Sequence, residues 1–259
     1  MGFLVAVIPS LPHQEIPRSD KTRSRPTRAQ GHLSGNASRL AALANENRRF
    51  VRRQPRQTNH SDPLVSMVKF KEEAAGVLKL SLYERPDCKA MLGQMRGHNG
   101  WEHATVRVEA DGDVYDSVAL PDIRSASVLY LDHFAEVMNS FDEKMRTTIK
   151  PLIKDFWSVD LAEYGGTQLV RYTPGGWYET HQDAGADFED RYFTVICYLN
   201  DNFAGGHTSF PYLNHAAVPE TGKAIVFPSK YFHRAEPVTR GEKYVLVSWV
   251  LGPVPIKWI

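Results

Sequence analysis

Cysteine and long apolar runs are both scarce in this sequence. Only Cys88 and Cys197 occur among the 259 residues, and a pair so far apart in the chain gives no disulfide framework. Neither lies in a nucleophile motif, so we interpret both as buried core residues of a protein in a reducing, cytoplasmic location. No apolar run approaches the roughly 18 residues that a membrane-spanning helix requires, so we expect no membrane association.

Acidic residues are scarce in the first sixty residues, which carry eleven Lys or Arg and three Asp or Glu. This Pro-, Ser- and Arg-rich composition cannot bury enough apolar surface to order itself. We therefore predict that residues 1–66 form a basic, disordered or weakly ordered arm. The alternatives are an organellar targeting segment and translation that begins near Met67. Aromatic residues do not alternate with the basic ones, and no known nucleic-acid reader motif occurs, so we do not expect nucleic-acid binding.

Residues 67–259 have the pattern of a single folded domain. Residues 76–83 alternate apolar and polar side chains as a half-buried strand does, and residues 84–98 predict a short helix. Apolar residues recur three and four positions apart over residues 132–157. This spacing predicts a long amphipathic helix, with a bend at Pro151.

Beyond Gly166 the helical spacing disappears and short strand-like runs follow one another, separated by Gly-Gly, Pro and Asn-Asp. Many short strands after a helical part predict an α+β, mainly β fold. The specific prediction is a double-stranded β-helix (a jelly roll) with supporting N-terminal helices. The runs are 167–172, 177–183, 192–200, 207–212, 223–228, 232–238 and 243–251.

His181 and Asp183 are two metal-binding side chains separated by one residue on a predicted strand. Residues two apart on a strand point to the same face, so both can face the interior of a jelly roll. An imidazole and a carboxylate suit Fe(II), Mn or Zn, and two histidines with one carboxylate form the facial triad of non-haem iron oxygenases. The spacing alone does not separate a metal site from a chance pairing.

A second histidine has to come from a later strand, where the candidates are His207, His215 and His233. His233 begins a predicted strand, and Lys243 follows it ten residues later on another. A buried cation near a metal is costly unless a carboxylate pairs with it. An acidic co-substrate such as 2-oxoglutarate would supply that carboxylate, which favours His233 as the third ligand.

Together these motifs resemble those of a known family, the 2-oxoglutarate/Fe(II) dioxygenases of the prolyl 4-hydroxylase type. The resemblance covers roughly residues 74–252 and is strongest over 166–252. The matching features are Tyr172 nine residues before His181-Gln182-Asp183, the run YLNDNFAGGHTSFP over 198–211, His233 ten residues before Lys243 and, as a weaker match to the family's Arg-x-Ser element, Arg124–Ser127.

The resemblance implies a set of site residues and cofactors. The cofactors are Fe(II), 2-oxoglutarate and O2, with ascorbate as a potential stimulant. Arg240 is an alternative to Lys243, but it precedes Gly241 in a predicted turn and is better explained as a solvated charge. The implied iron ligands are His181, Asp183 and His233, the implied 2-oxoglutarate contacts are Lys243, Tyr172 and Thr194, and the candidate substrate contacts are Tyr178, His207, Trp249 and Arg124.

The reaction that the resemblance implies is hydroxylation of an unactivated C–H bond, with succinate and CO2 as co-products. Family halogenases have Gly or Ala in place of the carboxylate ligand, so Asp183 favours hydroxylation over halogenation. Desaturation or cyclisation by the same iron chemistry is one alternative, and a non-catalytic jelly roll that binds a metal or metabolite is another. A zinc hydrolase is disfavoured, because no general base has a motif around it.

The substrate is open among an amino acid, a peptidyl proline and a small natural product, so we expect a small-molecule or peptide partner. A nucleic-acid demethylase is disfavoured, because Lys243 and Trp249 stand where such enzymes usually carry Arg. Residues 110–125 are acidic and are predicted to form a lid at the entrance. An acidic lid would suit a cationic or zwitterionic substrate, or a basic peptide. No pattern in the sequence predicts the oligomeric state.

Overall fold

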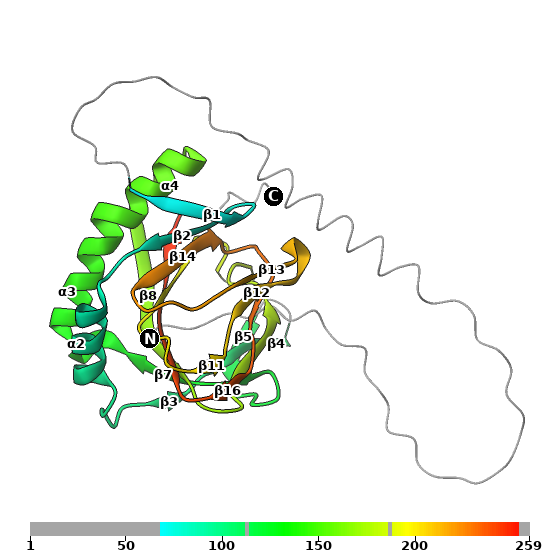
Figure 1. The fold of residues 1–259 in the computed structure, drawn as a ribbon. Coiled ribbons are helices and arrows are strands. Elements are labelled where there is room, and N and C mark those ends of the chain that lie inside the picture. The colour runs from blue at the N-terminus through cyan, green and yellow to red at the C-terminus, as the bar shows by residue number, and fades with distance from the viewer. Residues whose placement is uncertain (1–67, 112–113, 186–187, 254–259) are drawn as a thin grey trace, which may run out of the picture. The chain divides into compact units, whose positions relative to one another are not determined.

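Two antiparallel sheets make up most of the structure (Figure 1), a computed structural model that describes residues 68–111, 114–185 and 188–253. The larger sheet has eight strands in the order β1-β2-β14-β10-β17-β8-β7-β3, and the smaller has five in the order β13-β12-β15-β9-β6. This mainly β arrangement, with helices supplied by the N-terminal half, is the jelly roll predicted from the sequence. The predicted arm, residues 1–66, lies outside the described residues.

Each of the seven predicted runs corresponds to a strand from residue 163 onward, although four of these strands are shorter than the predicted run. The larger sheet consists of β1 (Phe70–Ala74), β2 (Val77–Ser81), β3 (Glu102–His103), β7 (Ser127–Tyr130), β8 (Glu163–Tyr172), β10 (Arg191–Tyr198), β14 (Lys223–Pro228) and β17 (Lys243–Leu251). The smaller sheet consists of β6 (Arg124–Ser125), β9 (Trp177–His181), β12 (Thr208–Phe210), β13 (His215–Ala217) and β15 (His233–Ala235). Two further pairs are β4 (Val106–Asp111) with β5 (Val114–Val118), and β11 (Ala204–Gly205) with β16 (Val238–Arg240).

The helices are α2 (Arg85–Met95), α3 (Ala135–Lys144) and α4 (Lys150–Trp157), with short 3-10 turns at Leu131–His133 and Pro211–Leu213. A π-helical segment, Met145–Ile149, joins α3 to α4 where a bend at Pro151 was predicted. Pro151 has no N–H to donate to a carbonyl of the preceding turn. The Lys150 N–H donates to the Met145 carbonyl five residues earlier, which is the π-helical pattern. None of the helices in the described residues is long and apolar enough to cross a membrane.

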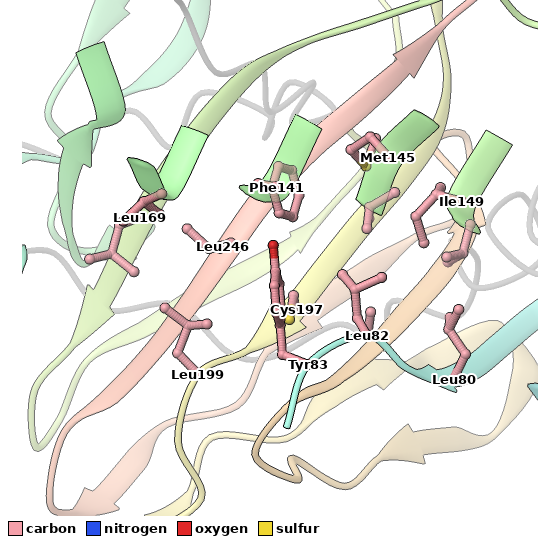
Figure 2. Close-up of a cluster of buried hydrophobic side chains, with 14 of the residues drawn as sticks. Leu80, Leu82, Tyr83, Phe141, Met145, Ile149, Leu169, Cys197, Leu199 and Leu246 are labelled. Carbon is pink, nitrogen blue, oxygen red and sulfur yellow. The ribbon is translucent and has the colours of Figure 1, made fainter. Parts of the chain in front are cut away.

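The hydrophobic core lies between these helices and one face of the larger sheet (Figure 2). Phe141, Met145 and Ile149 reach down from the helices toward buried side chains of the sheet such as Leu246. Successive residues of a strand point to opposite faces. Leu246 therefore packs in the core, whereas its neighbours of odd number on β17 face the space between the two sheets.

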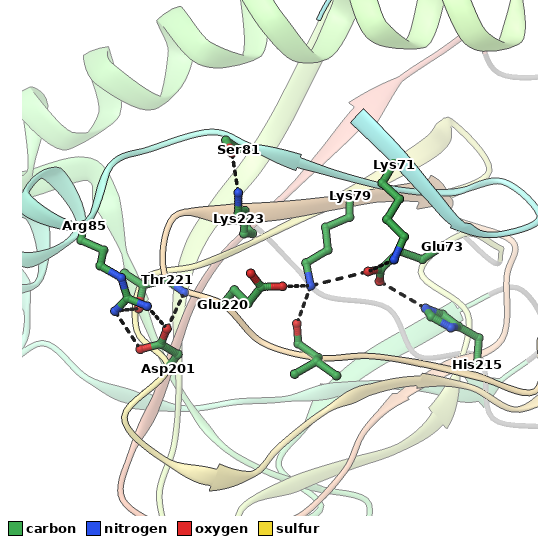
Figure 3. Close-up of polar contacts among 11 residues, drawn as sticks. Lys71, Glu73, Lys79, Ser81, Arg85, Asp201, His215, Glu220, Thr221 and Lys223 are labelled. Atoms are coloured by element: carbon green, nitrogen blue, oxygen red, sulfur yellow. Dashed lines mark hydrogen bonds and ion pairs between the residues drawn. The ribbon is translucent and has the colours of Figure 1, made fainter. Parts of the chain in front are cut away.

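Polar contacts join the first two strands to β13 of the smaller sheet and to the loop that follows it (Figure 3). The Lys79 amine is 2.5 Å from a carboxylate oxygen of Glu220 and 3.6 Å from one of Glu73, and it donates to the Val218 carbonyl at 2.9 Å. The other oxygen of Glu73 lies 3.4 Å from Nε2 of His215 on β13. The buried amine of Lys79 is thus paired with two carboxylates, which offset the cost of burying its charge.

Candidate metal centre

The three predicted metal ligands come from the ends of neighbouring strands. His181 is the last residue of β9, and His233, the first residue of β15, is its partner across the antiparallel pair. Asp183 lies just beyond β9 rather than on it, with its N–H bonded to the Ser229 carbonyl at 2.9 Å. One donor atom from each of the three side chains falls within 4.8 Å of the others, and all three residues are buried.

The histidine rings are oriented for metal binding through Nε2. Nδ1 of His181 is 2.7 Å from the Glu179 carbonyl, and Nδ1 of His233 is 3.0 Å from the Tyr231 carbonyl. A carbonyl only accepts, so Nδ1 carries the proton and Nε2 keeps its lone pair. Each Nε2 lies 3.5 Å from an oxygen of Asp183, so the free lone pairs and the carboxylate face one small volume.

The protonation states also suit a metal site. Burial, together with neighbouring His181, lowers the pKa of His233 to about 4, so the ring is neutral at physiological pH. Burial raises the pKa of Asp183, but the two histidines and the Thr194 hydroxyl outweigh it and hold that pKa below the ordinary range. Neutral imidazoles and an ionised carboxylate are the forms that bind a metal.

The hydroxyl of Thr194, a residue predicted to contact 2-oxoglutarate, is bonded to one of the metal ligands. Oγ1 donates to the Asp183 carboxylate at 2.7 Å and lies 2.9 Å from Oγ of Ser229. Thr194 therefore orients a metal ligand, a role in which a hydrogen bond fixes the carboxylate before the ion arrives. Ser229 was missed from the sequence, because it follows β14 in a run with no recognisable motif.

Lys243 is a buried cation facing the same cavity as the metal ligands. It is 2% exposed, and burial lowers the pKa of its amine from 10.5 to about 7. Its amine donates to the Gly206 carbonyl at 2.7 Å, and no ion pair to it occurs among the described residues. Tyr172, its partner across β8 and β17, is buried against it, with the amine 5.0 Å from the ring centre. Arg240, the alternative clamp, is exposed on β16.

Of the four candidate substrate contacts, Tyr178 and Arg124 line the cavity. The Tyr178 ring stacks on His181 with centroids 3.6 Å apart, and its buried hydroxyl has no hydrogen-bond partner. The guanidinium of Arg124, a residue that is 4% exposed, lies 4.6 Å from the centre of the Tyr178 ring. His207 is half-buried and is not among the residues that line the cavity.

Trp249 faces inward, as its spacing from Lys243 predicted, and is 1% exposed. The guanidinium of Arg191 lies 3.7 Å from its ring centre. Gly166 approaches the ring so closely that a Cβ atom there would be 2.8 Å from it. Trp249 thus packs as a wall beside the centre, on the strand next to Thr194.

Residues 167–251, which hold all of these groups, match the sequence profile of the 2OG-Fe(II) oxygenase superfamily. Over these residues the chain is similar to the prolyl 4-hydroxylase-like oxygenases of this superfamily. Fe(II), 2-oxoglutarate and O2 are the cofactors of this superfamily, and the buried His-Asp-His group has the donor set that Fe(II) takes in such enzymes.

Similar proteins of this superfamily carry prolyl hydroxylase names. A putative prolyl 4-hydroxylase of Acanthamoeba polyphaga mimivirus is 29% identical over 54% of this chain and 65% of its own length. Prolyl 4-hydroxylase subunit alpha-1 of Gallus gallus is 29% identical over 44% of this chain and 26% of its own length. The chain therefore spans less than two thirds of either relative.

A solved structure shares the fold. The viral collagen prolyl hydroxylase from Paramecium Bursaria Chlorella virus-1, in complex with 2OG, superposes with a TM-score of 0.53. The match covers 69% of this chain and 97% of that one, at 20% sequence identity. It supports the jelly-roll assignment of the described residues.

Proposed function

We propose that this protein is a hydroxylase that oxidises an unactivated C–H bond of a peptidyl proline, an amino acid or a small natural product. Succinate and CO2 would be the co-products of 2-oxoglutarate. The observation that carries the proposal is that one cavity is lined by both the His-Asp-His group and Lys243, a cation with no carboxylate partner among the described residues. A scaffold that bound only a metal would have no use for this buried amine, whereas a dicarboxylate co-substrate would pair with it.

Each residue of the cavity has a distinct task in this proposal. His181 and His233 would hold Fe(II) through Nε2, and Asp183 through its carboxylate, leaving further positions on the metal open. The amine of Lys243 would bind the carboxylate of 2-oxoglutarate remote from the metal, with Tyr172 beside it. When bound, Fe(II) and 2-oxoglutarate supply the oxidising chemistry with O2. The buried walls exclude water from the reacting atoms.

Prolyl residues are the first substrates to test, because both curated relatives described above carry prolyl 4-hydroxylase names. Asp183 supports hydroxylation as the outcome, since a carboxylate ligand occupies the position that a halide would need. A substrate gaining one oxygen atom would agree with this proposal. Loss of two hydrogens would instead indicate desaturation or cyclisation.

The test is reconstitution with Fe(II) and 2-oxoglutarate without oxygen, followed by exposure to air and measurement of succinate. The wild-type protein should release succinate slowly even without substrate, and the His233→Ala variant should release none. His215→Ala is the matched control, because His215 lies on β13 beside Glu73, away from the cavity. Equal succinate release by wild type and His233→Ala would remove the iron assignment. Screening of prolyl peptides and amino acids by mass spectrometry then addresses the substrate.

A further inference from the structure

A second cavity adjoins the one that holds the metal ligands. Its volume is about 190 Å³, enough for roughly six water molecules at about 30 Å³ each. Arg124 lines both cavities and thus stands at their junction. The polar side chains that line the second cavity are His103, Arg124, Ser125, Ser127, Arg171 and Thr173.

Two guanidinium groups of this cavity have no carboxylate partner among the residues that the structure describes. Arg124 is 4% exposed; Nη1 donates to the Thr105 carbonyl at 2.9 Å, while its buried Nε has no hydrogen-bond partner. The guanidinium of Arg171 lies 4.4 Å from the ring centre of Trp101, and its Nε is likewise buried without a partner. No Asp or Glu is among the described residues that line the cavity. Arg124 is buried and Arg171 half-buried. An unpaired buried cation is costly, so an anion that enters beside Arg124 would regain part of this energy.

Other cations of the described residues show what pairing looks like in this protein. Arg85 holds Asp201 through two hydrogen bonds, and Arg96 lies 3.2 Å from a carboxylate oxygen of Glu242. Lys79, which is nearly as buried as Arg124, is paired with Glu220. These three cations have carboxylate partners, whereas Arg124 and Arg171 have none among the described residues.

We infer that the second cavity is a substrate subsite that binds a carboxylate group of the substrate. The inference rests on the proposed function, because it places the oxidised carbon over the metal and the carboxylate near Arg124 and Arg171. Guanidinium groups bind carboxylates through directed, charge-assisted hydrogen bonds, and the neighbouring hydroxyl groups of Ser125, Ser127 and Thr173 can donate to the same oxygens.

This inference changes an expectation drawn from the sequence. The acidic segment 110–125 was expected to favour a cationic substrate. The wall of the cavity takes Ala119, Pro121, Arg124 and Ser125 from this segment, and Asp116 lies exposed on β5. The charge next to the centre is therefore positive, and it favours an acidic substrate, or a zwitterion that enters by its carboxylate.

The test uses a matched pair of probes, N-acetylglycine and N-acetylglycinamide, which differ in the carboxylate. Each is titrated by calorimetry, at pH 7 and low salt, into the full-length protein with Fe(II) and 2-oxoglutarate under nitrogen. We expect the acid to bind at least tenfold more tightly than the amide. Arg171→Gln should remove at least most of that difference, whereas Arg96→Gln, a surface guanidinium, should leave it unchanged.

A second variant, His103→Gln, tests the subsite if the Arg171→Gln protein does not fold. His103 is exposed on the short strand β3, so His103→Gln should fold normally and weaken binding of the acid by roughly threefold. Equal affinity of the wild-type protein for acid and amide, or a preference that is undiminished in both Arg171→Gln and His103→Gln, would overturn the subsite. Succinate release by the same protein samples reports on the proposed function separately, so either idea can fail without the other.

Discussion

Replacing Lys243 with methionine should make the protein more stable and its binding of 2-oxoglutarate weaker. Methionine has a similar length and no charge. Burial lowers the pKa of the Lys243 amine from 10.5 to about 7, which corresponds to about 5 kcal/mol of unfavourable burial at pH 7. The variant loses the hydrogen bond to the Gly206 carbonyl, worth about 1 kcal/mol. The free energy of unfolding should therefore rise by about 2–4 kcal/mol.

The stability difference between the Lys243→Met variant and the wild type should depend on pH. Between pH 7 and 10.5 the unfolded chain keeps a proton on Lys243 that the folded protein has lost, so wild-type stability rises with pH in this window. The advantage of the methionine variant should accordingly shrink by about 2–3 kcal/mol from pH 7 to pH 9. Urea unfolding at both pH values measures this difference. The exposed Lys154, paired with Asp160, gives the control Lys154→Met, which should show no such change.

The affinity of the Lys243→Met variant for 2-oxoglutarate should be lower than that of the wild type, although its free energy of unfolding is higher. Removing the cation that pairs with a buried carboxylate costs about 2–5 kcal/mol, so the Kd should rise by between roughly 30-fold and several thousandfold at pH 7. Only the charged amine pairs with the carboxylate, so wild-type affinity should fall above pH 7 while that of the variant stays constant. Calorimetry without oxygen measures the affinity of the wild type and of the variant for 2-oxoglutarate. A variant that is less stable than wild type and binds 2-oxoglutarate equally well would refute the reasoning.

Two further substitutions test the walls of the centre. Thr194→Val removes the hydroxyl that donates to Asp183, so Fe(II) affinity should fall by about 10- to 100-fold; unchanged affinity in a metal titration would contradict this role. Gly166→Ala places a Cβ atom 2.8 Å from the Trp249 ring at a φ of +67°, and should lower the free energy of unfolding by about 2–3 kcal/mol. Its control is Gly165→Ala, where the nearest atom is at 3.8 Å; equal losses in thermal unfolding would count against the close packing.

Much of the fold was readable from the sequence, because strand alternation and helical spacing are local patterns. The runs after residue 166 and the helical spacing over 132–157 each correspond to elements of the structure. Strands β1, β6, β7 and β13 are among those that were missed. β1 is an edge strand with the polar sequence FKEEA, and β6 has only two residues. Such strands exist because a neighbouring strand pairs with them, and their own residues carry little signal.

The sequence by itself determined which residues are candidates for the centre: His181 and Asp183 are two positions apart, and Lys243 follows His233 by ten positions. Both intervals are short stretches of chain: the first covers the end of β9, and the second runs from β15 through β16 to β17. Only the tertiary structure decided which side chains support them. Thr194 and Ser229 meet because β10 lies beside β14. The two guanidinium groups of the second cavity likewise come together only through sheet packing, since side chains distant in the chain become neighbours when strands pair and sheets face each other.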